Sequence, residues 1–304
     1  MSSSTLFRSI LALLRTMMLA CALAAASSAQ AATKIYTVTA PDGVALAVRE
    51  SGDPQGIPVI LVHGLLGSTL NWEAQIADPR LQRYRLISYD MRGHGLSGKP
   101  AAAEAYSDGR RWADDLQAVI RSSRATRPVL VGWSLGAAVI SNYLAAYGDG
   151  ALSGAVYVDG VIELKPEQIV AHPELYRDMN APDLKTHLDA VREFLRLCFQ
   201  TQPAAPDFER LLASAAVASW DMQRSVQSMQ VDVAGGLGKA TVPVLLIYGA
   251  QDALVKAGPA IARASEVNPR IRSKLYDASG HAPFIEEADR FGRDLAAFID
   301  GLKH

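Results

Sequence analysis

Short runs of apolar residues recur along the chain, and most of them are bounded by turn residues. Runs of this length and character predict β-strands, and those that are apolar at every position predict strands buried on both faces. The first two follow a more mixed pattern, and a Pro-Asp-Gly turn separates them. The predicted strands cover residues 34–40, 44–50, 58–64, 85–90, 128–132, 154–160, 242–249 and 273–277.

Between several of these runs the apolar positions change to a helical spacing. In residues 108–123, Trp112, Leu116, Val119 and Ile120 fall on one side of a helix, and residues 137–148 and 286–302 predict two further helices. Buried strands alternating with helices are typical of a parallel sheet covered on both faces. The sequence therefore predicts an α/β fold with a doubly wound, mostly parallel sheet.

The alternation stops between the strands at 154–160 and 242–249. Residues from about 164 to 239 contain no strand-like run, and their pattern predicts helices over 173–179, 182–199 and 207–229. We interpret this segment as a helical insertion in one domain that extends from residue 32 to residue 304.

The first 31 residues resemble a secretory signal rather than part of the fold. Arg8 and Arg15 lie before an apolar region that is unbroken over residues 17–26. Ala29-Gln30-Ala31 then forms a small-x-small sequence of the kind at which signal peptides are cleaved. We expect cleavage after Ala31 or Ala32, export to the periplasm or the exterior, and no stable membrane span afterwards. The alternative is an uncleaved anchor that also uses residues 10–14, although Arg15 would interrupt it.

Composition narrows the possible partners. The 304 residues are 49% hydrophobic and carry a formal net charge of −1, which is typical of a globular protein and shows no basic stripe for nucleic acid. Removal of the leader would leave Cys198 as the only cysteine, so no internal disulfide is expected. Because Cys198 lies in an apolar helical stretch, we expect a buried, unreactive thiol. The partner that we expect is a small-molecule substrate.

Candidate chemistry centres on the pentapeptide GWSLG at residues 132–136. A strand precedes Ser134 and an apolar helix follows it, which is the context that a nucleophilic serine at a sharp strand-to-helix turn requires. Gly132 and Gly136 leave room for the turn. The helix N-terminus and the Leu135 backbone N–H can then stabilise negative charge on a reacting oxygen.

A serine hydroxyl needs a base that a carboxylate orients. His281 lies in the loop after the last strand, and such loops meet above the carboxyl edge of a parallel sheet. Asp252 follows the strand at 242–249 and is the favoured acid, whereas Asp159, directly after GAVYV at 154–158, is the alternative. The order Ser134, Asp252, His281 is the one expected for hydrolases on this type of sheet.

These motifs together resemble the α/β-hydrolase superfamily. The similarity rests on VHGLLGS, SYDMRGHGLSGKP, VGWSLGAAV, IYGAQDALV and SGHAPFIEE, in that order, and is strongest to cofactor-free haloperoxidases, perhydrolases and arylesterases. It implies that the Leu65 N–H is a second oxyanion donor, that His63 and His94 shape loops, and that the 164–239 insertion is a lid. Ser134 argues against the epoxide hydrolases and haloalkane dehalogenases, which use aspartate.

The predicted reaction is hydrolysis of a small or medium uncharged carboxylic ester through an acyl-enzyme, with no metal or organic cofactor. Trp72 and Trp133 are the candidate substrate-binding residues. Perhydrolysis, lactone or amide cleavage, C–C bond hydrolysis and acyl transfer to an alcohol stay open because they use the same triad, and a non-catalytic binding protein on this fold is the alternative of another class. Further candidates for the pocket lining, from the insertion, are Leu195, Phe199, Leu211 and Trp220.

Overall fold

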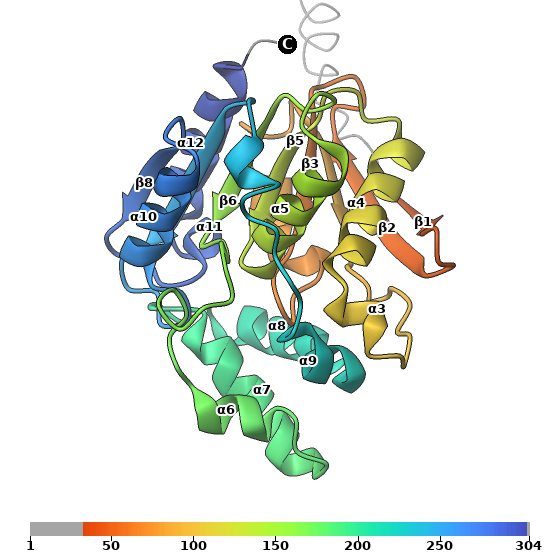
Figure 1. Ribbon diagram of the computed structural model, residues 1–304, viewed down its shortest axis with the longest axis vertical. Helices are drawn as coiled ribbons and strands as arrows, with labels where there is room; N and C mark the ends of the chain where they lie inside the picture. The colour runs from red at the N-terminus through yellow and green to blue at the C-terminus, as the bar shows by residue number, and fades with distance from the viewer. Residues whose placement is uncertain (1–32, 303–304) are drawn as a thin grey trace, which may run out of the picture. The chain divides into compact units, whose positions relative to one another are not determined.

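A computed structural model describes residues 33–302, which contain one eight-stranded sheet in the order β1-β2-β4-β3-β5-β6-β7-β8 (Figure 1). Strand β2 runs antiparallel to both of its neighbours, and all pairs from β4 to β8 are parallel. Every predicted strand is present. The strands are β1 (Lys34–Thr39), β2 (Ala45–Gly52), β3 (Pro58–Val62), β4 (Arg85–Tyr89), β5 (Val129–Trp133), β6 (Gly154–Val158), β7 (Val244–Gly249) and β8 (Arg272–Tyr276).

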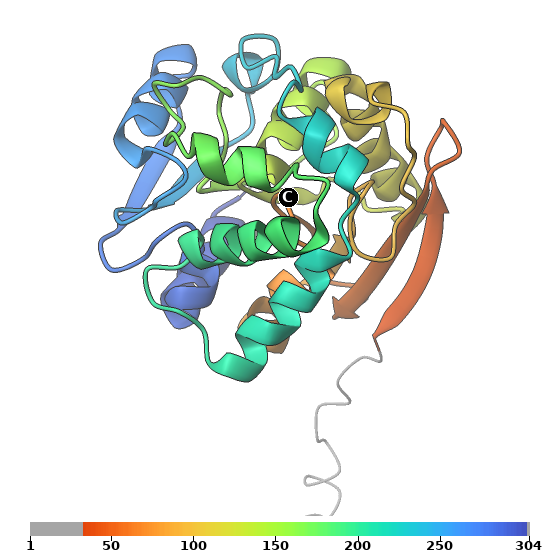
Figure 2. The ribbon, with the colours of Figure 1, turned by 90° about the horizontal axis from the view of Figure 1, so that it is seen from below.

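Helices cover both faces of the sheet, as Figures 1 and 2 show from two directions. Helices α4, α5 and α10 pack on one face, and α2 and α12 pack together on the other. The central strands are therefore apolar throughout, and β5, β6 and β7 are buried at every residue. The bounds are η1 (Thr69–Trp72), α2 (Glu73–Ala77), α3 (Glu104–Ser107), α4 (Gly109–Ser123), α5 (Leu135–Tyr147), α10 (Ala257–Val267), α11 (Pro283–Glu286) and α12 (Ala288–Asp300).

Five of these helices, η1, α2, α3, α10 and the four-residue α11, are absent from the sequence-based prediction. Helices η1, α2 and α3 have four or five residues each, too few for a helical periodicity to show. Helix α10 begins with Ala257, Gly258 and Pro259, which are signals of a turn. Proline is nevertheless tolerated in the first turn of a helix, because its missing N–H would have no partner there.

Between β6 and β7 the chain forms the helical insertion α6 (Pro173–Asp178), α7 (Leu184–Leu197), α8 (Ala205–Ala216) and α9 (Trp220–Val226), followed by η2 (Leu237–Lys239). Helices α6 to α9 lie together beyond one edge of the sheet (Figure 1). The sequence pattern predicts one helix over 207–229, but the structure breaks it at Ser219. The Ser219 N–H donates to the Gly93 carbonyl (2.7 Å), and the Ser219 hydroxyl accepts from the Met222 N–H, so a tertiary contact and a cap end one helix and begin the next.

None of the helices in residues 33–302 is long and apolar enough to cross a bilayer. The expected leader, with its cleavage site at Ala31 or Ala32, lies outside the described residues.

Candidate active site

Ser134 stands at the junction of β5 and α5 in a strained backbone conformation. Its φ of 52° and ψ of −116° lie in a region that a non-glycine residue adopts at a cost of about 1–3 kcal/mol. Hydrogen bonds hold it there. The Ser134 N–H donates to Val158 O (2.9 Å), while the Ser134 carbonyl accepts from the N–H groups of Ala137 (3.0 Å) and Val161 (3.1 Å). The side chain is thereby fixed at the carboxyl edge of the sheet.

Glycines around the serine make this turn possible. A Cβ on Gly136 would lie 2.3 Å from Val62 O, and a Cβ on Gly132 would lie 2.6 Å from Gly136 O. A Cβ on Gly64, in the neighbouring loop, would lie 2.9 Å from the Ser134 Cβ. All three contacts are shorter than real Cβ contacts, so the close approach of strand, helix and loop requires glycine at each position.

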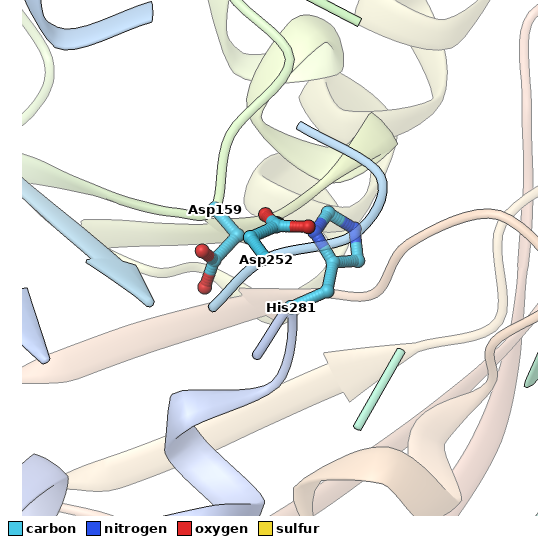
Figure 3. Close-up of side chains that lie close together, drawn as sticks. All are labelled: Asp159, Asp252 and His281. Atoms are coloured by element: carbon cyan, nitrogen blue, oxygen red, sulfur yellow. Dashed lines mark hydrogen bonds and ion pairs between the residues drawn. The ribbon is translucent and has the colours of Figure 1, made fainter. Parts of the chain in front are cut away.

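His281 and Asp252 form a direct pair (Figure 3). The His281 Nδ1–H donates to Asp252 Oδ2 (2.7 Å), and both side chains are almost completely buried. The other oxygen, Asp252 Oδ1, accepts from the N–H groups of Leu254 (2.7 Å) and Val255 (3.0 Å). With its Nδ1 bound in this way, His281 presents Nε2 as the nitrogen free to accept a proton.

Asp159, the alternative acid, lies beside the same pair. One carboxylate oxygen each of Asp159 and Asp252 and one His281 ring nitrogen lie within 4.8 Å of one another. Figure 3 shows Asp252 between Asp159 and His281. The bond to His281 is made by Asp252. Aspartate and histidine side chains can also bind metal ions. Here Asp252 and His281 Nδ1 are hydrogen-bonded to each other, and such an arrangement suits proton transfer by His281.

A cavity of about 400 Å³ opens onto Ser134 and His281 together. Its size is within the range of small-molecule sites, and most of its lining is aliphatic or aromatic. The cationic residue in its lining, Lys165, pairs with Glu163 (2.9 Å). The lining comprises Leu65, Ser134, Leu135, Val161, Leu164, Lys165, Pro166, Ile169, Val170, Ala171, His172, Pro173, Tyr176, Phe194, Val226, Gln227, Leu254, Val255 and His281.

Two backbone N–H groups at this cavity, those of Leu65 and Leu135, have no hydrogen-bond acceptor within residues 33–302. Leu135 is the first residue of α5, where an N–H has no partner inside the helix. Leu65 belongs to a tight turn, closed by the hydrogen bond from the Gly67 N–H to Gly64 O (3.0 Å). The arrangement leaves two donors available to an oxygen atom beside Ser134.

Buried histidines hold the loop that carries Leu65. The Met91 N–H donates to His63 Nε2 (2.9 Å), so the proton of the ring is on Nδ1, which donates to Gly64 O (2.8 Å). Burial lowers the pKa of His63 to about 4. The pKa of His94 is lowered to about 3, mainly by burial and to a smaller extent by the nearby His63. Both rings are therefore neutral at neutral pH and serve as hydrogen-bonding and packing groups.

Residues 57–288 match the family described as alpha/beta hydrolase fold. The chain belongs to the α/β-hydrolase family. A crystal structure from Burkholderia cenocepacia, provisionally assigned as an aryl esterase, is 71% identical with a TM-score of 0.87 and covers 88% of this chain and 98% of its own. The esterase RhEst1 from Rhodococcus sp. ECU1013 is 28% identical with a TM-score of 0.80, covering 88% and 99%.

Among curated relatives, a bifunctional esterase/perhydrolase of Acinetobacter calcoaceticus is 27% identical over 281 residues, covering 86% of this chain and 98% of its own. The protein is thus an enzyme of the esterase type, as the sequence motifs predict. The predicted resemblance to the haloperoxidase, perhydrolase and arylesterase branch is confirmed.

The structure of the hydrolase differs from the sequence-based expectation for its tryptophans. Trp72 and Trp133 are buried in the core and are not among the residues that line the cavity. Both pack against Phe284, and the Trp133 Nε1–H donates to His281 O (2.6 Å). Trp133 is the last residue of β5, and its ring centroid lies 5.7 Å from that of His281 and 5.1 Å from that of Phe284. The Trp133 ring thus packs against His281, and the Trp72 ring packs against Phe284.

The residues that the helical insertion contributes to the cavity wall differ from those expected from the sequence. Leu195, Phe199, Leu211 and Trp220 do not line the cavity, whereas Phe194 does. One residue along a helix turns the side chain by about 100°, so the helical pattern identifies α7 but not the side chain that points inward. Eight of the 19 lining residues instead come from residues 164–173, most of which are irregular and whose sequence carries no pattern that predicts this wall.

Cys198 of the hydrolase is buried, as expected, and burial raises the pKa of its thiol well above the usual value. The thiol is therefore protonated and unreactive at neutral pH.

Proposed function

We propose that the protein is a serine carboxylesterase in which Ser134 is the nucleophile, His281 the general base and Asp252 the acid that orients it. The observation that carries this proposal is the apolar cavity that Ser134 and His281 line together, with His281 bound to Asp252 (2.7 Å). The unpaired N–H groups of Leu65 and Leu135 at the same cavity support it.

In the first half of the reaction, His281 Nε2 takes the hydroxyl proton as Ser134 Oγ attacks the ester carbonyl carbon. The negative charge that develops on the carbonyl oxygen is stabilised by the N–H groups of Leu65 and Leu135. Each donor of this kind contributes about 10²–10³-fold to the rate. Asp252 keeps the proton of neutral His281 on Nδ1 and stabilises the ring when it becomes charged.

In the second half, His281 gives its proton to the leaving alcohol, which departs and leaves an acyl group on Ser134. A water molecule then attacks the acyl carbon while His281 takes a proton from it. The second tetrahedral intermediate collapses to release the acid and to restore the serine hydroxyl. All proton transfers pass through His281.

The cavity favours uncharged esters with apolar substituents. A volume of about 400 Å³ and a lining that is mostly apolar suit an aromatic or branched aliphatic group, and Lys165 is already paired with Glu163. The similarity to a protein provisionally assigned as an aryl esterase supports an aryl ester as the substrate class. We expect phenyl esters of short acids to be hydrolysed faster than esters that carry a carboxylate.

The test combines a fluorophosphonate probe with a panel of phenyl and alkyl esters. The wild-type chain should be labelled on Ser134 and should hydrolyse the esters. Ser134→Ala should fold normally, lose the label and lose about 10⁵–10⁶-fold in kcat. Absence of labelling and of turnover in the wild type would favour a binding protein on this fold, and near-normal turnover by Ser134→Ala would exclude this serine.

Perhydrolysis is the second candidate, because the Acinetobacter relative is named as both an esterase and a perhydrolase. Hydrogen peroxide would replace water in the attack on the acyl-enzyme, and the products would be a peracid and the free serine. Peracid formation from an ester in the presence of peroxide, absent in Ser134→Ala, tests this activity.

A further inference from the structure

Asp159 is a buried carboxyl group that the proposed mechanism does not use. It follows β6 with a φ of 42° and is 0% exposed. Its Oδ1 accepts from the Gly249 N–H (2.8 Å), whereas its Oδ2 has no hydrogen-bond partner among the described residues. A buried oxygen without a partner costs about 1–3 kcal/mol, so its retention beside the active site calls for a functional reason.

Two adjacent buried carboxyl groups do not both ionise, because their charges repel in a medium of low dielectric constant. The hydrogen bonds decide which one carries the charge. Asp252 accepts three, from His281 Nδ1–H and from the N–H groups of Leu254 and Val255, while Asp159 accepts one. Burial, and then the nearby Asp252, raise the pKa of Asp159 well above its ordinary value. The charge therefore resides on Asp252 and the proton on Asp159.

We propose that Asp159 is a positioning residue of the triad, a neutral carboxylic acid that donates a hydrogen bond to the Asp252 carboxylate. This inference rests on the esterase mechanism proposed above. A carboxylate has about four acceptor sites, and the backbone and His281 occupy three of those on Asp252. The fourth donor fixes the orientation of Asp252 and disperses part of its charge.

The other titratable groups near the carboxyl pair, which lie on different elements, do not supply this proton. The pKa of Tyr176 in α6 is raised to about 12 by burial, and burial raises those of Cys198 and Tyr248 well above their ordinary values, so these three groups stay neutral and do not change charge near neutral pH. The Tyr248 hydroxyl is bonded to a backbone carbonyl. Glu286 in α11 is half-buried and accepts from two backbone N–H groups. Among these groups, Asp159 is the fully buried carboxyl with an oxygen that has no hydrogen-bond partner within residues 33–302, and it lies beside the pair.

The test compares Asp159→Asn with Asp159→Gly by the pH profile of kcat/KM for a phenyl ester. Asparagine keeps an N–H donor without a charge and tolerates a positive φ, and glycine adopts this φ freely but removes the donor. We expect Asp159→Asn to remain within about twofold of the wild type, since it can still donate. Asp159→Gly should move the acid limb upward by roughly half to one pH unit, because His281 then holds its proton more tightly.

Infrared spectroscopy at neutral pH supplies a second measurement that does not depend on the glycine variant. The wild type should show a carbonyl band of a buried protonated carboxyl group, which shifts in D₂O and is missing in Asp159→Asn. Absence of this band, or an acid limb in Asp159→Gly that coincides with that of the wild type, would overturn the inference while leaving the esterase mechanism intact. A loss of about 10³-fold or more in Asp159→Asn, with Asp252→Asn active, would instead refute the proposed triad.

Discussion

The replacement Asp252→Asn tests the proposed mechanism at the group whose role is the most sharply defined by its hydrogen bonds. The Asp252 carboxylate accepts on both oxygens, from two backbone N–H groups at Oδ1 and from His281 at Oδ2. An asparagine amide has only one acceptor oxygen. If that oxygen keeps the two backbone bonds at 2.7 and 3.0 Å, the NH₂ group must face His281.

The amide nitrogen then donates to His281 Nδ1, so the ring proton moves to Nε2. The nitrogen that faces Ser134 becomes a donor and can no longer accept the hydroxyl proton. In serine hydrolases with this arrangement the wrong tautomer lowers kcat by about 10⁴-fold, which corresponds to roughly 5.5 kcal/mol of the activation barrier. The fold should hardly change, because the volume and the backbone bonds of the side chain are conserved.

The assay is steady-state hydrolysis of a phenyl ester, with Asp159→Asn as the matched control on the neighbouring carboxyl and thermal unfolding to verify the fold. We expect kcat of Asp252→Asn to fall by about 10⁴-fold with a similar KM, since the lost interaction is made in the transition state. A well-folded Asp252→Asn variant with kcat within tenfold of the wild type would refute the assignment of the acid.

Three further predictions concern the turn, the buried histidines and the leader. Gly136→Ala places a Cβ 2.3 Å from Val62 O and should destabilise the fold by about 3 kcal/mol or prevent folding, measured by thermal unfolding against an alanine at the unobstructed Gly258. Because burial lowers the folded-state pKa of His63 to about 4 from an unfolded value of 6.5, the unfolded chain binds the proton first. The free energy of unfolding should fall by about 3 kcal/mol from pH 6.5 to 4 on account of this group, and a titration of stability in His63→Gln should be correspondingly flatter. We propose that the chain is exported, so mass spectrometry of the exported form should place its N-terminus after Ala31 or Ala32, and a chain that retains residues 1–31 would contradict this.

The alternation of apolar strands with helices determined the fold class and the positions of the central strands. That information is local, because a strand buried on both faces must be apolar at consecutive residues. The GWSLG turn is also recognisable from consecutive residues, because a strand precedes it and a helix follows it, although Gly136 is required by the approach of Val62 O in β3. Both features were predictable because their pattern lies in one continuous segment of the sequence.

The relation between Asp159 and Asp252 depended on the tertiary structure. Both residues follow a parallel strand, and β6 and β7 are neighbours in the sheet, so the sequence placed both carboxyls at one edge without deciding between them. The pairing of Asp252 with His281, and the unpaired oxygen of Asp159, arise from how three loops meet. No periodicity within any one loop encodes that meeting.

The cavity wall also required the tertiary structure. Its segment 164–173 is irregular and is held by contacts with the loop of Asp252, such as the hydrogen bond from the Val170 N–H to Leu254 O (2.9 Å). Trp133 shows the same dependence, because a large aromatic residue next to the serine packs equally well in a core or in a pocket. The sequence by itself determined the strands, the turn and the types of reacting group. Only the packing of distant segments decided which side chains face the cavity, because burial of a side chain depends on neighbours that are remote in the chain.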